Sequence, residues 1–236
     1  MTRWMKVMFG FVLSCFTHGC ASNVEFKRQS FVFNGETRNY AVYIPAGYDE
    51  KKAYPAILFL HGLFEGGNDG KDMTTVGLGP AIAKHPQRWN AVVIFAQTSG
   101  SWRDSDQHPL ALATLDAAAK KYHINPKRVV LTGLSTGGAG VWRLGAQHPQ
   151  RFAALAPLCA YSAYDEVPKL TKIPIWAFHN STDPFVSSGS TDEMVKRINA
   201  AGGNARKTIY GRFGHNCWDA AYGNAKVVEW LTTQTK

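Results

Sequence analysis

Six segments of the chain are apolar at almost every position, without the polar alternation of a strand that has one face in water. Such segments are typical of strands in a parallel sheet that helices cover on both faces. Helical patterns separate most of them, and this alternation indicates an α/β fold with right-handed crossovers. The predicted strands are residues 56–60, 91–96, 128–132, 153–158, 173–178 and 207–210, and the predicted helices are residues 110–122, 136–147, 191–200 and 220–232.

The segment before these strands has a different pattern. Residues 24–33 and 40–44 alternate between apolar and polar positions, and Asn34-Gly35, the strongest short signal of a β-hairpin, lies between them. A chain of 236 residues, 45% of them hydrophobic, can form one large core but not two ordinary ones. We therefore predict a single domain over residues 21–236, with an antiparallel hairpin at the start of a mostly parallel sheet and no large cap.

Residues 1–20 are typical of a secretory signal rather than of a folded domain. Arg3 and Lys6 precede an apolar stretch over residues 7–16 that is too short to cross a bilayer as a permanent helix. We therefore expect an exported protein, either periplasmic or secreted. Cys20 lies in a segment that resembles a bacterial lipoprotein acylation site, so a lipid anchor on Cys20 at the outer membrane and plain secretion are both open.

Two cysteines, Cys159 and Cys217, belong to the predicted domain itself. In an exported protein such a pair is often joined, and both lie near loops predicted to form the active site. A disulfide and two separate buried thiols are both compatible with the sequence.

The net charge of +9 suggests an acidic partner such as nucleic acid. The basic pairs at residues 51–52, 120–121 and 127–128 are scattered, however, and no aromatic residues are interleaved with them as a nucleic-acid platform requires. We therefore expect no nucleic-acid partner.

Ser135 is the candidate nucleophile. It lies in Gly133-Leu134-Ser135-Thr136-Gly137, between a predicted strand and a predicted helix, which is the pattern of a nucleophile elbow. The serine of such a turn has a strained backbone, so the residues two positions before and after it must be small. The helix N-terminus at this point also favours negative charge.

A serine nucleophile needs a base, and the base needs a carboxylate that orients it. On a sheet of this class these residues follow in the order Ser, Asp or Glu, His. Asp183 comes after the strand predicted over residues 173–178, where the carboxyl ends of the strands form the site. Asp165 and Asp219 are rivals that fit this order less well. His215 alone combines the required order, a late loop and a preceding glycine.

The oxyanion hole of such a site needs two backbone N–H donors. Thr136 follows the nucleophile, and Leu63 follows His61-Gly62 after an early strand, so we expect these two residues to supply the donors. His61 then has a structural role behind the loop. A metal site of His61, His179 and His215 has no supporting ligand spacing, and we expect neither a metal nor another cofactor.

Together these motifs resemble the capless esterases of the α/β-hydrolase superfamily. This group includes polyhydroxybutyrate-depolymerase-like and feruloyl-esterase-like proteins and bacterial sequences described as predicted peptidases. The resemblance extends from Tyr40 to Trp230 and implies the triad Ser135, Asp183 and His215. It departs at residues 97–99, where relatives commonly have a Pro-Gln-Cys-like segment, so we expect this loop to shape the substrate cleft. The matching segments are residues 60–62, 65–69, 125–129, 152–159, 183–184 and 214–218.

Only about fourteen residues separate the strands predicted over 153–158 and 173–178, which leaves room for a short loop but not for a helical lid. The cleft is therefore expected to be open, which suits an ester on a sugar or a polymer better than a buried lipid chain. The residues expected to contact substrate are Phe64, Trp102, Tyr161, Phe185 and Trp218.

These expectations describe a serine carboxylesterase that works through an acyl-enzyme. Its substrates, small or carried on a polymer, would be esters of sugars, polysaccharides or aromatic acids. A serine peptidase and a polyester depolymerase would use the same triad. A non-catalytic binding protein on the same fold is the alternative of a different class, and an intact triad disfavours it.

Overall fold

The computed structural model describes residues 24–236, and the predicted signal and Cys20 lie outside this part of the chain. Their roles therefore stay predictions. No helix within residues 24–236 is both long and apolar enough to cross a membrane.

One eight-stranded sheet forms the centre of the protein, with the strand order β1-β2-β4-β3-β5-β6-β7-β8. The pairs β1–β2 and β2–β4 are antiparallel, and every later pair is parallel. This arrangement confirms the predicted fold class. The strands are Phe26–Phe33 (β1), Glu36–Tyr43 (β2), Tyr54–Leu60 (β3), Val92–Ala96 (β4), Ile124–Leu134 (β5), Ala154–Leu158 (β6), Ile175–Thr182 (β7) and Ala205–Phe213 (β8).

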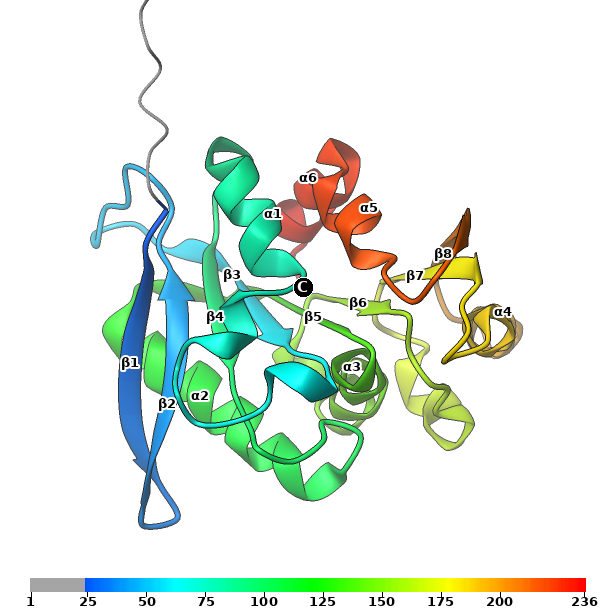
Figure 1. Ribbon diagram of the computed structural model, residues 1–236, viewed down its shortest axis with the longest axis horizontal. Helices are drawn as coiled ribbons and strands as arrows, with labels where there is room; N and C mark the ends of the chain where they lie inside the picture. Colours follow the sequence, from blue (N-terminus) through cyan, green and yellow to red (C-terminus); the bar gives the residue numbers. More distant parts are fainter. Residues whose placement is uncertain (1–23) are drawn as a thin grey trace, which may run out of the picture.

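Helices cover both faces of the sheet, which is why its central strands are apolar throughout (Figure 1). Successive residues of a strand point to opposite faces. Leu58 and Leu60 therefore join a core with α2, α3 and α4, while Ile57 and Phe59 join a second core with α1, α5 and α6. The helices are Leu78–Lys84 (α1), His108–Lys121 (α2), Thr136–Gln147 (α3), Ser188–Ala200 (α4), Trp218–Gly223 (α5) and Ala225–Thr233 (α6).

The hairpin between β1 and β2 turns at Asn34 and Gly35, as predicted. Both residues have positive φ angles, of 51° and 80°, which a two-residue turn with the twist of the strands requires. Asparagine and glycine are the residues that adopt this conformation at least cost.

Several details differ from the sequence prediction. The helix predicted over residues 220–232 is two helices, because the chain turns at Asn224 and its side chain accepts a hydrogen bond from the backbone N–H of Lys226 to cap α6. Helix α1 was not predicted. Strand β7 continues to Thr182, since His179, Asn180 and Thr182 pair with β8, with a shift of register at Ser181, and this segment does not form a turn.

Short 3-10 helices occupy several connections. Where lipases carry a lid, between β6 and β7, the described chain has a single 3-10 helix and no long insertion. The 3-10 helices are Leu63–Glu65 (η1), Asp72–Thr74 (η2), Pro86–Arg88 (η3), Ser105–Gln107 (η4), Pro149–Arg151 (η5) and Tyr164–Leu170 (η6).

Candidate active site

Ser135 stands between the end of β5 and the start of α3 in a strained conformation, with φ 56° and ψ −117°. Few non-glycine residues adopt a positive φ, and those that do are frequently functional. Its backbone N–H donates to the carbonyl oxygen of Leu158 at 2.9 Å. The turn therefore holds Ser135 at the carboxyl edge of the sheet, where a parallel α/β fold places its site.

The glycines on either side of Ser135 are required by close backbone contacts. A Cβ atom on Gly137 would lie 2.1 Å from the carbonyl oxygen of Leu60, and one on Gly133 would lie 2.7 Å from the same atom. Neither distance is possible for a real side chain. The elbow motif is thus a steric consequence of how tightly α3 packs against the end of β3.

Asp183 and His215 meet at this edge of the sheet from β7 and β8. His215 Nδ1 lies 2.6 Å from Asp183 Oδ2, and the Asp183 side chain is fully buried while 17% of the His215 side chain is exposed. The Oδ1 atom of Asp183 accepts hydrogen bonds from the backbone N–H groups of Phe185 and Val186 at 2.9 and 3.1 Å. The carboxylate is therefore fixed, and it holds the imidazole of His215 through one nitrogen.

The charge of Asp183 is stabilised despite its burial. Burial alone would raise the pKa of this carboxyl group, but the hydrogen bonds from His215 and from the backbone of Phe185 and Val186 lower it overall. The His179 ring lies beside the Asp183 carboxylate. Its Nε2 atom is 2.9 Å from the Val186 carbonyl oxygen, and its Nδ1 atom is 2.8 Å from the Thr191 hydroxyl oxygen. Burial lowers the pKa of His179, so this ring is a neutral support at neutral pH.

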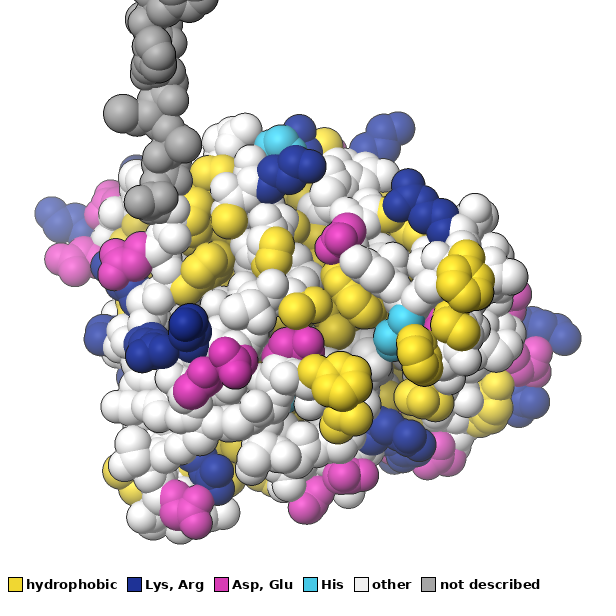
Figure 2. All heavy atoms as spheres, viewed as in Figure 1, with side chains coloured by type: hydrophobic (Ala, Val, Ile, Leu, Met, Phe, Trp, Pro, Cys, Tyr) yellow, Lys and Arg dark blue, Asp and Glu magenta, His cyan; other side chains and the backbone are white. Residues whose placement is uncertain are grey.

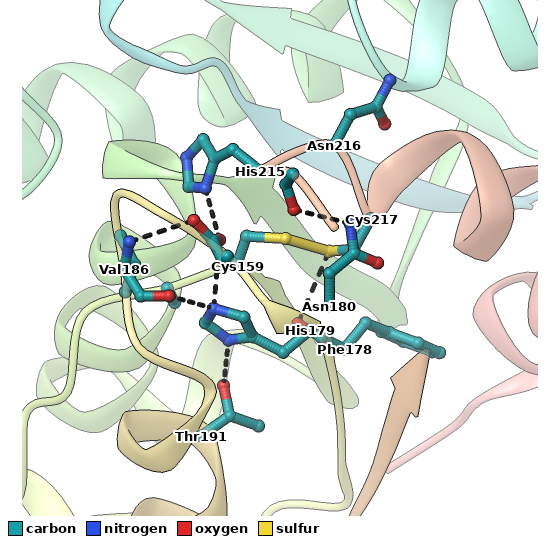
Figure 3. Close-up of a disulfide and its surroundings, with 12 residues drawn as sticks. Cys159, Phe178, His179, Asn180, Val186, Thr191, His215, Asn216 and Cys217 are labelled. Carbon is teal, nitrogen blue, oxygen red and sulfur yellow. Dashed lines mark hydrogen bonds and ion pairs between the residues drawn. A yellow bond between two sulfur atoms is a disulfide. The ribbon is translucent and has the colours of Figure 1, made fainter. Parts of the chain in front are cut away.

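The loop that carries His215 is attached to the rest of the site at two further points (Figure 3). The Asn180 side chain donates to the carbonyl oxygen of Gly214 at 2.8 Å. Cys217 is joined by a disulfide to Cys159, which directly follows β6. Leu158, the residue before Cys159, accepts the hydrogen bond from the backbone N–H of Ser135. The disulfide therefore connects the loop of His215 with the end of β6, which holds the backbone of Ser135.

We expect loss of this disulfide to lower the stability of the protein substantially. The bridge closes a loop between residues 58 positions apart, and the chain-entropy relation gives about 4 kcal/mol for a loop of that size. The Cys159→Ala/Cys217→Ala variant should therefore unfold at a lower temperature by about 8 °C or more. Thermal melts with and without a phosphine reductant would measure this. The reductant should lower the melting temperature of the wild type and leave that of the variant unchanged. Equal melting temperatures for the variant and the untreated wild type would contradict the prediction.

Leu63 and Thr136, the residues expected to form the oxyanion hole, have backbone N–H groups that are free of helical acceptors. Thr136 is the first residue of α3 and Leu63 is the first residue of η1, so neither N–H has an acceptor within its own helix. The loop of Leu63 is held by Glu65, whose carboxyl group accepts hydrogen bonds from the backbone of Gly62 and of Glu65 itself; burial nevertheless raises the pKa of this carboxyl. Leu63 and Thr136 line the same cavity as Ser135.

His61 lies behind this loop. Its Nδ1 is 2.5 Å from the carbonyl oxygen of Gly62, and its Nε2 accepts the backbone N–H of Thr98 at 3.2 Å. These two contacts require a neutral ring with its proton on Nδ1. Burial is the main reason that the pKa of His61 is lowered to about 4. The ring therefore joins the loops after β3 and β4 and does not reach the nucleophile's cavity.

This burial predicts a pH dependence of stability. Between about pH 6.5 and pH 4 the unfolded chain binds a proton on His61 and the folded protein does not, so stability falls as the pH falls through this window. The contribution amounts to about 3 kcal/mol across the window. His61→Gln, which keeps hydrogen-bonding atoms but does not titrate, should lose less stability between pH 7 and pH 4.5 in urea unfolding experiments. Parallel losses in both proteins would refute the assignment.

Ser135 and His215 open into one cavity of about 380 Å³. Two aromatic side chains at its mouth are strongly exposed: Phe64 at 92% and Phe185 at 73%. Figure 2 shows hydrophobic side chains grouped around an exposed histidine in the middle of this face of the molecule. The cavity is lined by Leu63, Phe64, Ser101, Arg103, Ser135, Thr136, Tyr161, Phe185 and His215.

The structure brings three of the five predicted substrate contacts to this cavity: Phe64, Tyr161 and Phe185. The expectation for Trp102 is wrong. Its side chain is completely buried, with its ring 5.4 Å from that of His61, because the segment after β4 turns inward and packs against α3. Trp218 lies outside the cavity lining and packs edge-on against His215, with ring centroids 5.5 Å apart.

The rival carboxylates are occupied elsewhere. Asp165 pairs with Arg143 at 3.6 Å, and Asp219 accepts a hydrogen bond from the Asn216 side chain at 2.8 Å.

Within residues 24–236, potential metal-ligand atoms of Cys159, His179 and Asp183 lie within 4.8 Å of one another. The sulfur of Cys159 belongs to the disulfide, however, so it offers no thiolate to a metal.

Three contributors to the site were not predicted from the sequence. Ser101 and Arg103 line the cavity, and Asn180 holds the backbone of the His215 loop. Asn180 lies in the polar stretch that directly follows the apolar segment 173–178, at the carboxyl edge of the sheet, and this position is a signal that could have identified it. Ser101 and Arg103 have no comparable signal, because their loop has no regular pattern.

Comparisons with known proteins identify the family of the chain. Residues 32–236 match the family named Esterase, described as "Putative esterase". No curated protein matches the chain significantly. Among solved structures, a thermostable esterase is similar, with a TM-score of 0.80 and 26% identity over 89% of this chain. The chain spans 63% of that esterase's length.

More distant solved structures share the fold. A CE1 ferulic acid esterase from Anaeromyces mucronatus has a TM-score of 0.63 and 15% identity, with 89% of this chain and 90% of the other covered. An acylaminoacyl peptidase from Pyrococcus horikoshii has a TM-score of 0.64 and 12% identity, with 89% and 40% covered. The eight-stranded sheet and the match over residues 32–236 lead to one conclusion: the chain belongs to the Esterase family within the α/β-hydrolase superfamily.

Proposed function

We propose that this protein is a serine carboxylesterase in which Ser135, His215 and Asp183 form the catalytic triad. The observation that carries the proposal is the 2.6 Å contact between His215 and Asp183 in a protein whose Ser135 occupies a strained elbow on the same cavity. The membership of the Esterase family supports the same reaction class.

The reaction proceeds in two steps. His215 accepts the hydroxyl proton as Ser135 Oγ attacks the ester carbonyl, and the oxyanion that forms is bound by the N–H groups of Leu63 and Thr136. Collapse of this intermediate breaks the ester bond, and the alcohol leaves with the proton from His215. A water molecule then attacks the acyl-enzyme in the same way, releasing the acid and restoring Ser135. Asp183 stabilises the imidazolium throughout.

The proposed substrates are esters of sugars, polysaccharides or aromatic acids. In support, the cavity is open rather than covered by a lid, and the exposed rings of Phe64 and Phe185 flank its mouth. Aromatic faces of this kind suit flat aromatic acyl groups and the apolar faces of sugars. The ferulic acid esterase of similar fold acts, by its name, on one such class.

Covalent labelling tests the proposal directly. A fluorophosphonate probe should react stoichiometrically with the purified protein, abolish hydrolysis of p-nitrophenyl acetate and modify the peptide that contains Ser135, as identified by mass spectrometry. A panel of feruloyl, acetyl-xylan, peptide and polyester substrates would then identify the preferred class. Hydrolysis that persists after complete labelling, or a label on another residue, would refute the assignment.

A further inference from the structure

Arg103 is the one cationic side chain among the residues that line the cavity of Ser135 and His215. It comes from the loop between β4 and α2. Its guanidinium carbon lies 4.3 Å from the centre of the Tyr161 ring, and Tyr161 lines the same cavity. This cation–π contact holds the guanidinium at the cavity.

The charge of Arg103 has no carboxylate partner in the part of the chain that the structure describes. Other arginines do have one: Arg143 pairs with Asp165 at 3.6 Å, and Arg197 pairs with Glu193 at 2.7 Å. The neighbouring carboxylates of Asp104 and Asp106 are exposed on the same loop and form no ion pair with it. Among the described residues that line the cavity there is no Asp or Glu.

The geometry leaves the hydrogen-bonding edge of the guanidinium available. The contact with Tyr161 is a cation–π contact and uses none of the N–H groups as hydrogen-bond donors to an oxygen, and these groups point outward in the guanidinium plane. Such an edge matches a carboxylate, which it can bind through two parallel hydrogen bonds. Arg103 is itself exposed, and the exposed apolar side chains of Leu63, Phe64 and Phe185 line the same cavity, so a substrate bound there displaces water from around this edge.

We propose that Arg103 makes this site selective for esters that also carry a carboxylate. This inference rests on the proposed esterase function and specifies its substrate class further. The carboxylate belongs either to the acyl part, as in a monoester of a dicarboxylic acid, or to the alcohol part, as in an acylated hydroxy acid or uronic acid. In both cases Arg103 binds the anionic group away from the reacting carbonyl and thereby lowers KM.

Two pairs of substrates separate these sources. For the acyl part, monomethyl adipate is compared with the neutral methyl adipamate. For the alcohol part, 4-acetoxybenzoate is compared with the neutral 4-acetoxybenzamide. Hydrolysis is followed by chromatography of the products, and the ratio of kcat/KM for the anionic and the neutral member is determined for each protein. Phenyl acetate reports the basal esterase activity.

The variants are Arg103→Gln and a matched control, Arg206→Gln. Arg206 is likewise stacked on an aromatic ring, 3.6 Å from the centre of Trp176, and it is not among the residues lining the cavity. Both variants lose one positive charge. We expect Arg103→Gln to lower the ratio of kcat/KM for the anionic and the neutral substrate by about tenfold or more in one of the two pairs, because KM for the anionic substrate rises. A loss of this size corresponds to one charge-assisted hydrogen bond. Arg206→Gln should keep the wild-type ratio.

The outcomes are distinct. If Arg103→Gln hydrolyses phenyl acetate normally and its ratio equals that of the wild type in both arms, the role of Arg103 is refuted and the esterase proposal stands. If Arg206→Gln lowers the ratio equally, the effect is one of overall charge and the role of Arg103 is likewise refuted. If the wild-type protein does not hydrolyse phenyl acetate at all, both proposals fail.

Discussion

Ser135→Ala is expected to lower kcat for a short p-nitrophenyl ester by about 10⁵-fold or more, since loss of the nucleophile of a triad has effects of this order. The reason is structural as well as chemical. Ser135 alone stands on the strained elbow between β5 and α3, and it shares its cavity with His215. Steady-state rates of the purified proteins would measure the effect.

The control for this variant is Ser101→Ala, because Ser101 is the other serine that lines the cavity, where its hydroxyl oxygen accepts a hydrogen bond from the backbone N–H of Arg103 at 3.3 Å. It can contribute at most a hydrogen bond to a substrate, so its loss should cost less than about tenfold. Ser135→Ala keeps the Cβ atom and should melt at nearly the wild-type temperature, which excludes unfolding as the cause. Similar rates for Ser135→Ala and the wild type would end the proposed mechanism.

Asp183→Asn is expected to lower kcat by about 10⁴-fold, the size known for the equivalent change in a serine protease triad. The backbone N–H groups of Phe185 and Val186 would hold the amide oxygen of the new residue, so its NH₂ group would face Nδ1 of His215. The imidazole would then carry its proton on Nε2, where it cannot accept the proton of Ser135. The variant should thus fold and bind substrate but react slowly.

Asp219→Asn is the matched control for this change. Asp219 lies four residues after His215 in the sequence, but it is exposed and bonded to Asn216 rather than to the imidazole. We expect its activity to stay close to that of the wild type. Equal losses in the two variants would show that the electrostatic field near His215, and not a specific contact with Asp183, is responsible. In that case the assignment of Asp183 as the orienting carboxylate would be wrong.

Features that depend on local sequence were predicted well. Apolar segments of five or six residues identify the buried strands, because each face of a covered sheet excludes polar side chains. Asn34-Gly35 identifies the hairpin because few residues tolerate its φ angles, and the glycines around Ser135 identify the elbow because nothing larger fits. The sequence pattern did not show where a continuous helical pattern is interrupted, as at Asn224, where α5 ends and α6 begins.

The amino-acid sequence by itself therefore determined the fold class, the strained position of Ser135 and the chain order of Asp183 and His215. These depend on periodicity and backbone sterics, which are encoded over a few residues. Tertiary structure alone decided that Cys159 and Cys217 are joined, that Trp102 is buried, and that Arg103 lines the cavity. The physical reason is that these properties depend on how distant segments pack against one another, and a side chain's neighbours across the fold decide whether it meets water, a partner or a substrate.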